Sequence, residues 1–335
     1  MSMNDFKIIN KMLFKYQGQD KNVVIPDFLS EIFKYAFMDC EGIEEITVGK
    51  GIRKIGDSAF FGCRGLKKIT IPSGVETIDN DAFQKCESLV SIKIPDSVIA
   101  IGNNAFRDCV SLECVELGNG IVAIEERTFS GCEKLKRIVI GDGVTKISGY
   151  AFYHCDKLES LVIGNGVTVI DTNAFAYCSS LKGVVIPDSV TRVGSSAFSS
   201  CKSLEYISLP NNLSSLEESV FYYSDNIKTV LVRNGDSITD EVRKLYIDIF
   251  GEEKIVFESG EIIETREALL ERRYTIIENI IKLGNLELLS TALETAREID
   301  VYALDDIIEI ARRLANPEAE KLLCEYKEYK FPTKS

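Results

Sequence analysis

Residues 66–86 read LKKITIPSGVETIDNDAFQKC, and the same arrangement recurs along most of the chain. Its phenylalanine, Phe83, is one of nine spaced by 23 residues, which are Phe37, Phe60, Phe83, Phe106, Phe129, Phe152, Phe175, Phe198 and Phe221. A cysteine follows each of the first eight by three residues, and Ser224 takes its place in the ninth copy. A fixed period of this length without insertions predicts a solenoid, in which each repeat is one rung stacked on the next.

Each repeat is expected to contain two extended segments and a turn. The segment Leu66–Ile71 alternates apolar and polar residues, which is typical of a half-buried strand. Pro72, or a glycine in other copies, ends that strand, and Val75–Ile78 forms a second extended segment before the Ala-Phe turn. The apolar side chains of one rung cannot be buried by that rung alone, so we expect the phenylalanines and cysteines to fill an interior shared by stacked rungs.

The ten cysteines are explained best as buried thiols. Eight lie on the 23-residue ladder, and no Cys-x-x-Cys or Cys/His cluster with zinc spacing occurs. Neighbouring rungs are close enough for a disulfide by Cα distance, but parallel side chains seldom offer the Cβ geometry that a disulfide needs. We therefore expect reduced thiols that act as small hydrophobic residues, with disulfides or a metal site as the alternatives.

The composition limits the classes of function. A net charge of −13, of which residues 240–335 contribute −8 through 22 acidic and 14 basic residues, argues against nucleic-acid binding. No apolar run approaches the length of a membrane-spanning helix, so membrane insertion is not expected. The first residues lack the features of a signal peptide. The chain as it stands therefore predicts a cytoplasmic protein, or a surface or secreted one if a signal has been removed.

Several units resemble a known repeat family. Residues 94–109 read IPDSVIAIGNNAFRDC and look like the BspA-like leucine-rich repeat, which has 23-residue rungs and appears in many bacterial proteins. The match spans about residues 8–232, and residues 12–26 resemble the degenerate leading repeat of such arrays. The resemblance implies a curved solenoid with a parallel sheet on its concave side, and a role as an interaction module or surface adhesin without catalytic residues.

The domain organisation follows from where the period ends. We expect a degenerate leading repeat or cap at 1–30, the solenoid at 31–233, a strand-helix-strand cap at 234–260 and a helical domain at 261–335. In the cap, residues 238–250 read as an amphipathic helix and 254–257 as a strand. Helices are then predicted at 265–282, 286–297, 301–314 and 317–329. The predicted fold class is therefore α+β, a leucine-rich repeat solenoid followed by a small all-α domain.

The sequence offers little that could carry catalysis. His154 is the only histidine, and it falls in a variable turn of the repeat. Gly-x-Gly recurs in register at three corners, as turns do and nucleotide sites do not. We therefore predict no enzymatic activity, no catalytic residue, no metal site and no cofactor.

Recognition is predicted to involve the outward side of the first strand. One column of outward positions contains Thr47, Thr70, Lys93, Glu116, Val139, Val162, Val185, Ser208 and Leu231. A parallel column contains Glu45, Lys68, Ser91, Cys114, Arg137, Ser160, Gly183, Tyr206 and Thr229. The candidate site on this concave face comprises Val139, Val162, Val185, Arg137, Ser160, Tyr206 and Leu231. Three outward valines suggest an apolar strip for a partner, although valine also simply favours strands.

Two other columns are notable. The first alternates in charge over its last six members and is interpreted as keeping the strands in register: Glu44, Lys67, Val90, Glu113, Lys136, Glu159, Lys182, Glu205 and Lys228. The second is an alternative surface patch of aromatic residues in the turn beside the cysteine: Tyr150, Tyr153, His154, Tyr177, Tyr222 and Tyr223. His154 and Tyr177 hold equivalent places in adjacent rungs, so they should be neighbours.

The sequence thus favours non-catalytic recognition of a protein partner through the sheet. The alternative is an adhesin that binds a host protein or a glycan.

Overall fold

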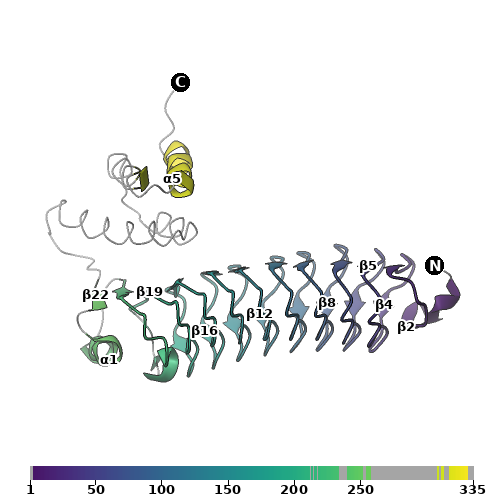
Figure 1. The fold of residues 1–335 in the computed structure, drawn as a ribbon, viewed down its shortest axis with the longest axis horizontal. Helices are drawn as coiled ribbons and strands as arrows, with labels where there is room; N and C mark the ends of the chain where they lie inside the picture. The colour runs from purple at the N-terminus through teal and green to yellow at the C-terminus, as the bar shows by residue number, and fades with distance from the viewer. Residues whose placement is uncertain are drawn as a thin grey trace. The chain divides into compact units, whose positions relative to one another are not determined.

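The chain forms two compact units, Met1–Glu258 and Ser259–Ser335. The structure, a computed structural model, describes residues 3–211, 213, 215–216, 218–233, 240–251, 254–257, 308, 311–312 and 317–330. Within the first unit, strands of successive repeats lie side by side along the array (Figure 1). The solenoid that the 23-residue period predicts is therefore confirmed.

The first strands of successive rungs pair in parallel within three sheets. These strands are β3 (Asn22–Val24), β5 (Glu45–Thr47), β7 (Lys68–Thr70), β9 (Ser91–Lys93), β11 (Cys114–Glu116), β13 (Arg137–Ile140), β15 (Ser160–Ile163), β17 (Gly183–Val185), β19 (Tyr206–Leu209), β21 (Thr229–Val232) and β22 (Ile255–Phe257). They make three sheets in rung order, β3-β5-β7, β9-β11-β13-β15 and β17-β19-β21-β22. Their outward side is called the first-strand face below.

The second extended segment forms sheets of its own on another side of the rung. Its strands are β2 (Met12–Tyr16), β4 (Glu31–Ile32), β6 (Lys54–Ile55), β8 (Thr77–Ile78), β10 (Ala100–Ile101), β12 (Ala123–Ile124), β14 (Lys146–Ile147), β16 (Val169–Ile170), β18 (Arg192–Val193) and β20 (Ser215–Leu216). β1 (Phe6–Ile9), which follows the short 3-10 helix η1 (Met3–Asp5), pairs antiparallel with β2. The hairpin turn, Asn10-Lys11, has φ of 51° and 62°, which suits a two-residue hairpin.

The turn that carries the phenylalanine closes the third side of the rung. Its backbone forms hydrogen bonds with the next rung; for example, the Phe60 N–H donates to the Ala82 carbonyl at 2.8 Å. Most rungs place two turn residues in the left-handed region, for example Asp81 at 53° and Lys85 at 61°. Left-handed backbone turns the chain sharply, so these positions return it to the next first strand.

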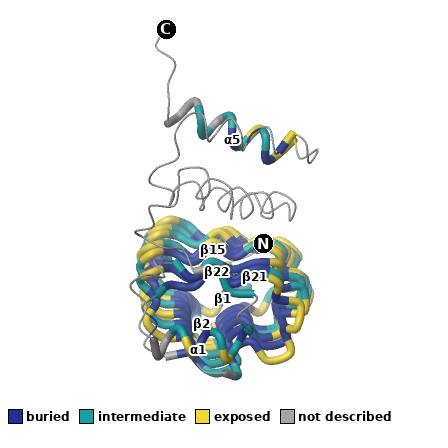
Figure 2. Tube along the Cα trace, turned by 90° about the vertical axis from the view of Figure 1, so that its left-hand side faces the viewer, coloured by how far each residue is buried: buried dark blue, intermediate teal, exposed yellow. Residues whose placement is uncertain are grey.

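The ladder residues fill the interior, as predicted. The first eight phenylalanines are fully buried and stack on one another with ring centroids 4.9–5.8 Å apart from Phe37 to Phe221. Tyr16 extends this stack at the N-terminal end, 5.2 Å from Phe37, and Phe250 meets Phe221 at 5.2 Å at the other end. Buried residues line the inside of each rung, and exposed ones lie at its corners (Figure 2). Stacked aromatic rings gain energy beyond their buried area, so the ladder stabilises the array along its length.

The ladder cysteines are free thiols that bond to the backbone of the preceding rung. Cys63, Cys86, Cys109, Cys132, Cys155, Cys178 and Cys201 are fully buried, whereas Cys40 is half-buried. Each of the seven donates Sγ–H to the carbonyl of the phenylalanine 26 residues earlier, at 3.1–3.4 Å. Ser224 makes the equivalent bond to the Phe198 carbonyl through Oγ at 2.8 Å. This bond explains why a serine can replace a cysteine in the ninth copy.

The array continues beyond Phe221, the last phenylalanine of the ladder, by one strand-helix-strand connection. The 3-10 helix η2 (Glu218–Phe221) precedes β21, and α1 (Asp240–Phe250) follows β21. α1 is terminated by Gly251, which has a φ of 83°. β22 then pairs in parallel with β21. The predicted helix and strand of this segment are confirmed within the described residues.

Of the second unit, the structure describes mainly α5 (Pro317–Lys330), which confirms the last predicted helix. The helices predicted at 265–282, 286–297 and 301–314 lie almost entirely outside the described residues. The all-α character of this unit therefore stays a prediction.

Candidate recognition surfaces

The first-strand face carries the predicted valine strip. Val139 lies opposite Val162, and Arg137 lies opposite Ser160, in the pairing of β13 with β15. Val139 is 41% exposed, while Val162 and Val185 are half-buried. The register therefore places the apolar column next to the column that contains Arg137, as the sequence indicates.

Two predicted members of this site offer almost no surface. Tyr206 and Leu231 lie on outward columns by register, yet only 6% and 8% of their surfaces are exposed. Tyr206 lies opposite Gly183, and Leu231 lies opposite Ser208, which are both buried as well. The expectation that Tyr206 and Leu231 present surface to a partner is therefore wrong.

Arg233, which the sequence did not single out, contacts this part of the face at Ser208. It follows β21 and donates from Nη1 to Ser208 Oγ at 2.6 Å. Nε and Nη2 donate to Asp188 Oδ1 at 3.0 and 2.8 Å, and Nη2 also donates to the Ile186 carbonyl. The guanidinium thus contacts the outward column at Ser208, and it connects this rung with the preceding one through Asp188 and Ile186.

The charged column forms ion pairs between neighbouring rungs. Glu44 contacts Lys21 and Lys67, both at 2.7 Å, and the Lys136–Glu113 and Lys228–Glu205 pairs are 2.7 and 2.9 Å apart. The hydrogen bonds from the two lysines lower the pKa of Glu44 to about 2. Because the pairs are exposed, they favour correct register more than they stabilise the fold.

The turn side gathers four of the six predicted aromatic residues into one group. Tyr150, Tyr153, His154 and Tyr177 are called the aromatic cluster below. The His154 ring stacks on Tyr177 at 4.4 Å, and Tyr153 makes edge contacts with Tyr150, His154 and Tyr177 at 5.4, 4.6 and 5.3 Å. His154 and Tyr177 are therefore neighbours, as predicted.

Charged side chains contact two members of the cluster, Tyr150 and His154. The guanidinium of Arg127, one rung before Tyr150 in the same column, lies 4.6 Å from the Tyr150 ring centroid. His154 Nδ1 lies 3.2 Å from Asp156 Oδ1. Burial, together with the neighbouring Tyr177 and Tyr150, raises the pKa of Tyr153, so its hydroxyl stays protonated. The Arg127 contact could have been predicted, because the residue is 23 positions before Tyr150.

The other two predicted aromatic residues form a separate pair. Tyr222 and Tyr223 contact each other at 6.3 Å and are 52% and 73% exposed. They lie two rungs beyond Ala176 and Tyr177 in the repeat, with the buried Ser199 and Ser200 between. The six residues therefore do not make one continuous patch.

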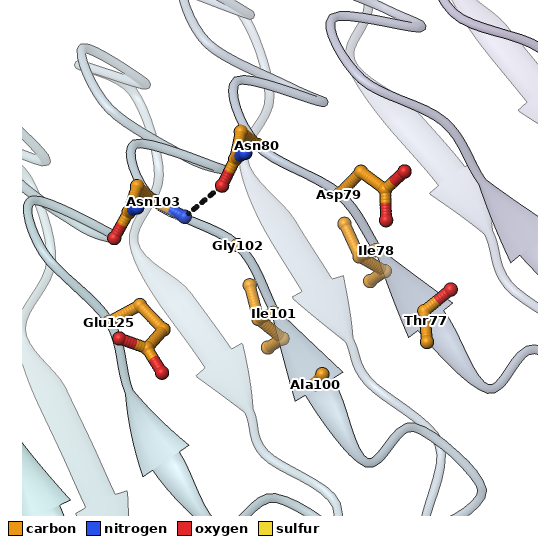
Figure 3. A pocket seen from close by; sticks show the side chains of 9 residues that line it. All are labelled: Thr77, Ile78, Asp79, Asn80, Ala100, Ile101, Gly102, Asn103 and Glu125. Carbon is orange, nitrogen blue, oxygen red and sulfur yellow. Dashed lines mark hydrogen bonds between the residues drawn. The ribbon is translucent and has the colours of Figure 1, made fainter.

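Two open hollows lie beside the second strands. The first is lined by Thr77, Ile78, Asp79, Asn80, Ala100, Ile101, Gly102, Asn103 and Glu125 (Figure 3). The second is lined by Asn103, Glu125, Glu126, Lys146, Ser148, Gly149, Tyr150 and Asp171. In the first, Asn80 Oδ1 accepts the Asn103 N–H at 2.8 Å, which fixes the amide at the rim. Tyr150 links the second hollow to the aromatic cluster, a connection that spacing in the sequence did not reveal.

The ladder thiols are interior groups that stay protonated. Burial raises the pKa of the ladder thiols, to about 12 for Cys201, so they are protonated and poor nucleophiles near neutral pH. Among the residues that the structure describes, no group of three or more His, Cys, Asp or Glu could hold a metal ion. Within the same residues, no helix is both long and apolar enough to span a bilayer.

These features define a β-solenoid repeat protein, a class whose side-by-side rungs present extended surfaces for recognition. The chain belongs to the family described as the BspA type leucine rich repeat region, whose six copies match residues 7–134 and 100–228. The predicted family is therefore confirmed.

Two solved structures, the first two described here, show the same fold. A leucine-rich repeat protein from Bacteroides ovatus is 30% identical, with a TM-score of 0.51, and the match covers 66% of this chain and 66% of that one. The T. pallidum leucine rich repeat protein TpLRR is 21% identical, with a TM-score of 0.50 and coverage of 78% of this chain and 99% of that one. A leucine rich cell surface protein from Faecalibacterium prausnitzii is 21% identical, with a TM-score of 0.34 and coverage of 71% and 94%. No curated protein matches the chain.

Proposed function

We propose that the protein is a non-catalytic recognition module that binds a protein partner through its first-strand face. The observation that carries this proposal is the run of outward valines in three consecutive rungs, Val139, Val162 and Val185. Arg137 and Ser160 border the strip, which gives an apolar centre beside polar groups. Protein interfaces commonly have this arrangement, and arginine is enriched in them.

The rigidity of the array supports binding by this face. The strands that carry Val139 and Val162, β13 and β15, pair in parallel over four residues, from Arg137–Ser160 to Ile140–Ile163. Their inward residues are buried, so the outward side chains are held in place before a partner arrives. A preorganised surface loses little conformational entropy on binding, which improves affinity without additional contacts.

The proposal is tested by placing a charge in the strip. The partner is first captured from a lysate of the cell that makes the protein, identified, and purified for titration against the intact chain. Val162→Glu should weaken binding at least 10-fold, because burying one valine contributes about 1.5–3 kcal/mol. A buried, unpaired carboxylate weakens it further. The thermal midpoint should be nearly unchanged, since Glu116 occupies the same outward column two rungs earlier and is exposed.

Thr70→Glu is the matched control, because Thr70 holds the same strand position and is exposed, but lies outside the valine strip. It should leave binding unaltered. Equal affinity of the native chain and Val162→Glu would reject this face as the binding surface.

The second candidate function is that of an adhesin at the cell surface that binds a host protein or a glycan. The exposed rings on the turn side favour it, because tyrosine offers contact area together with a polar tip. Labelling of intact cells with a membrane-impermeant reagent tests the location. Labelling only after lysis would exclude the adhesin function.

A further inference from the structure

We propose that the aromatic cluster and the hollow beside Tyr150 form one binding site for a neutral oligosaccharide. This site lies on the turn side and the second-strand side of the rungs, so it is separate from the valine strip. It does not depend on the protein-binding function proposed above.

Three residues of the cluster occupy turn positions that are left-handed in most rungs. Tyr150, His154 and Tyr177 have φ of 59°, 58° and 65°, in the left-handed region that bulky side chains avoid. In the column of His154 and Tyr177, two other rungs have Gly62 and Gly131, which adopt such angles without strain. The same angles occur at Lys85, Arg127 and Tyr223, so this backbone is a property of the repeat, and the side chain at these turn positions can vary without a change of fold.

The rings are also fixed before a ligand arrives. His154 and Tyr177 are nearly parallel, at 15° and 4.4 Å, and the Tyr153 ring braces both from the side. One rung further in the same column is the small, buried Ser200, so the stack ends at Tyr177, which is 38% exposed. An exposed aromatic face suits the C–H face of a pyranose ring, because the negative ring face attracts the positive C–H groups.

The hollow supplies the polar half of the site. Its wall includes Asn103, Glu126, Lys146, Ser148 and Asp171, and Tyr150 lies at its edge. These side chains offer an amide, two carboxylates, an ammonium and a hydroxyl, which together can donate to and accept from sugar hydroxyls. A mainly apolar ring face beside a few polar groups is the usual composition of a small-ligand site.

Charge and spacing disfavour other ligands. The hollow contains three carboxylates, of Glu125, Glu126 and Asp171, against one ammonium, of Lys146, so phosphate and sulfate groups would be repelled. A quaternary ammonium needs an open space between rings, but the centroids in the cluster are only 4.4–5.4 Å apart. A neutral sugar fits both halves of the site, because it has a C–H face for the rings and hydroxyl groups for the hollow.

The test uses the intact chain and an array of neutral oligosaccharides built from glucose, galactose, mannose and their N-acetyl derivatives. The strongest hit is then titrated in solution, with tyrosine fluorescence as the signal, since the chain has no tryptophan. Tyr177→Ser and Tyr150→Asn should each weaken binding at least 10-fold. Both variants should fold, because the next rung carries Ser200 and Asn173 at the equivalent left-handed positions.

Tyr223→Ser is the matched control. Tyr223 has the same column position and a φ of 60°, and it is 73% exposed, but it lies outside the aromatic cluster. Its affinity for the sugar should stay within 2-fold of the native value, and binding should be insensitive to NaCl between 50 and 500 mM.

Three results would overturn the proposal. The first is that no neutral glycan on the array binds, and the second is that Tyr177→Ser binds as the native chain does. The third is a strong loss of binding with salt, which would point to a charged ligand such as a basic peptide.

Discussion

Replacing a ladder thiol by a hydroxyl should make the protein less sensitive to alkaline unfolding. Cys201 is fully buried, and its Sγ–H donates to the Phe175 carbonyl at 3.3 Å. Burial raises the pKa of this thiol from 9.0 to about 12. Between these values the unfolded chain releases the proton and the folded chain keeps it. The thiol's contribution to stability is therefore complete below pH 9 and is lost as the pH rises toward 12.

The size of the effect follows from proton linkage. With an unfolded pKa of 9.0, the loss is about 1 kcal/mol at pH 10 and about 2 kcal/mol at pH 10.5. In Cys201→Ser this loss disappears, because a serine hydroxyl does not ionise in this range. The other ladder thiols are the same in both proteins, so they cancel in the difference.

The assay is urea unfolding of the native chain and Cys201→Ser at pH 7.5, 9, 10 and 10.5, followed by circular dichroism. Serine is tolerated at the equivalent place, since Ser224 bonds to the Phe198 carbonyl at 2.8 Å. The stability difference between the two proteins should shift in favour of the variant by about 1 kcal/mol from pH 7.5 to pH 10. Ser224→Cys, which adds a thiol to the ladder, should shift it in the opposite direction. If the free energy of unfolding fell equally with pH in the native chain and in Cys201→Ser, the burial argument would be refuted.

Three further outcomes are expected. Phe129→Ala should destabilise the array by ~3–5 kcal/mol in chemical unfolding, because Phe129 is fully buried between two stacked rings; a near-neutral result would contradict this. Tyr246→Phe should lower the free energy of unfolding by about 1–3 kcal/mol, because the buried hydroxyl donates to the Pro210 carbonyl at 3.0 Å. A thermal unfolding midpoint equal to that of the native chain would count against this hydrogen bond. In an NMR titration, the pKa of Glu44 should be about 2, and Lys67→Gln should raise it. Because the folded chain holds this pKa below the usual 4.5, the stabilising effect of the lysines is present above pH 4.5 and is lost as the pH falls through 2. No movement would show that Lys67 does not contact Glu44.

Much of the candidate surface was readable from the period. Because strands of adjacent rungs pair without a shift, residues 23 apart lie opposite one another, as Val139 and Val162 do. The same rule correctly predicts the contact of His154 with Tyr177 and the pairing of Lys67 with Glu44. Register in a parallel sheet is strongly specified when one face is buried, since a slip of one residue would expose the core.

The errors and omissions concern contacts that do not follow the period. Arg233 reaches back to Asp188, 45 residues earlier, and no spacing rule predicts such a contact. The burial of Tyr206 and Leu231 also departs from the repeat, because outward residues as far as Val139 are exposed, whereas those of the next two rungs are half-buried or buried. The hollow beside Tyr150 combines residues from several rungs and two sides of each rung, so it could not be seen in any single column.

The sequence by itself determined the solenoid, the interior ladders and the register, because a strict 23-residue period allows only neighbour-to-neighbour stacking. Only the tertiary structure decided which outward positions remain accessible and where rings and polar groups of different columns meet. Accessibility depends on how side chains from the corners and the last rungs fold over the surface, and the repeat pattern does not encode those directions.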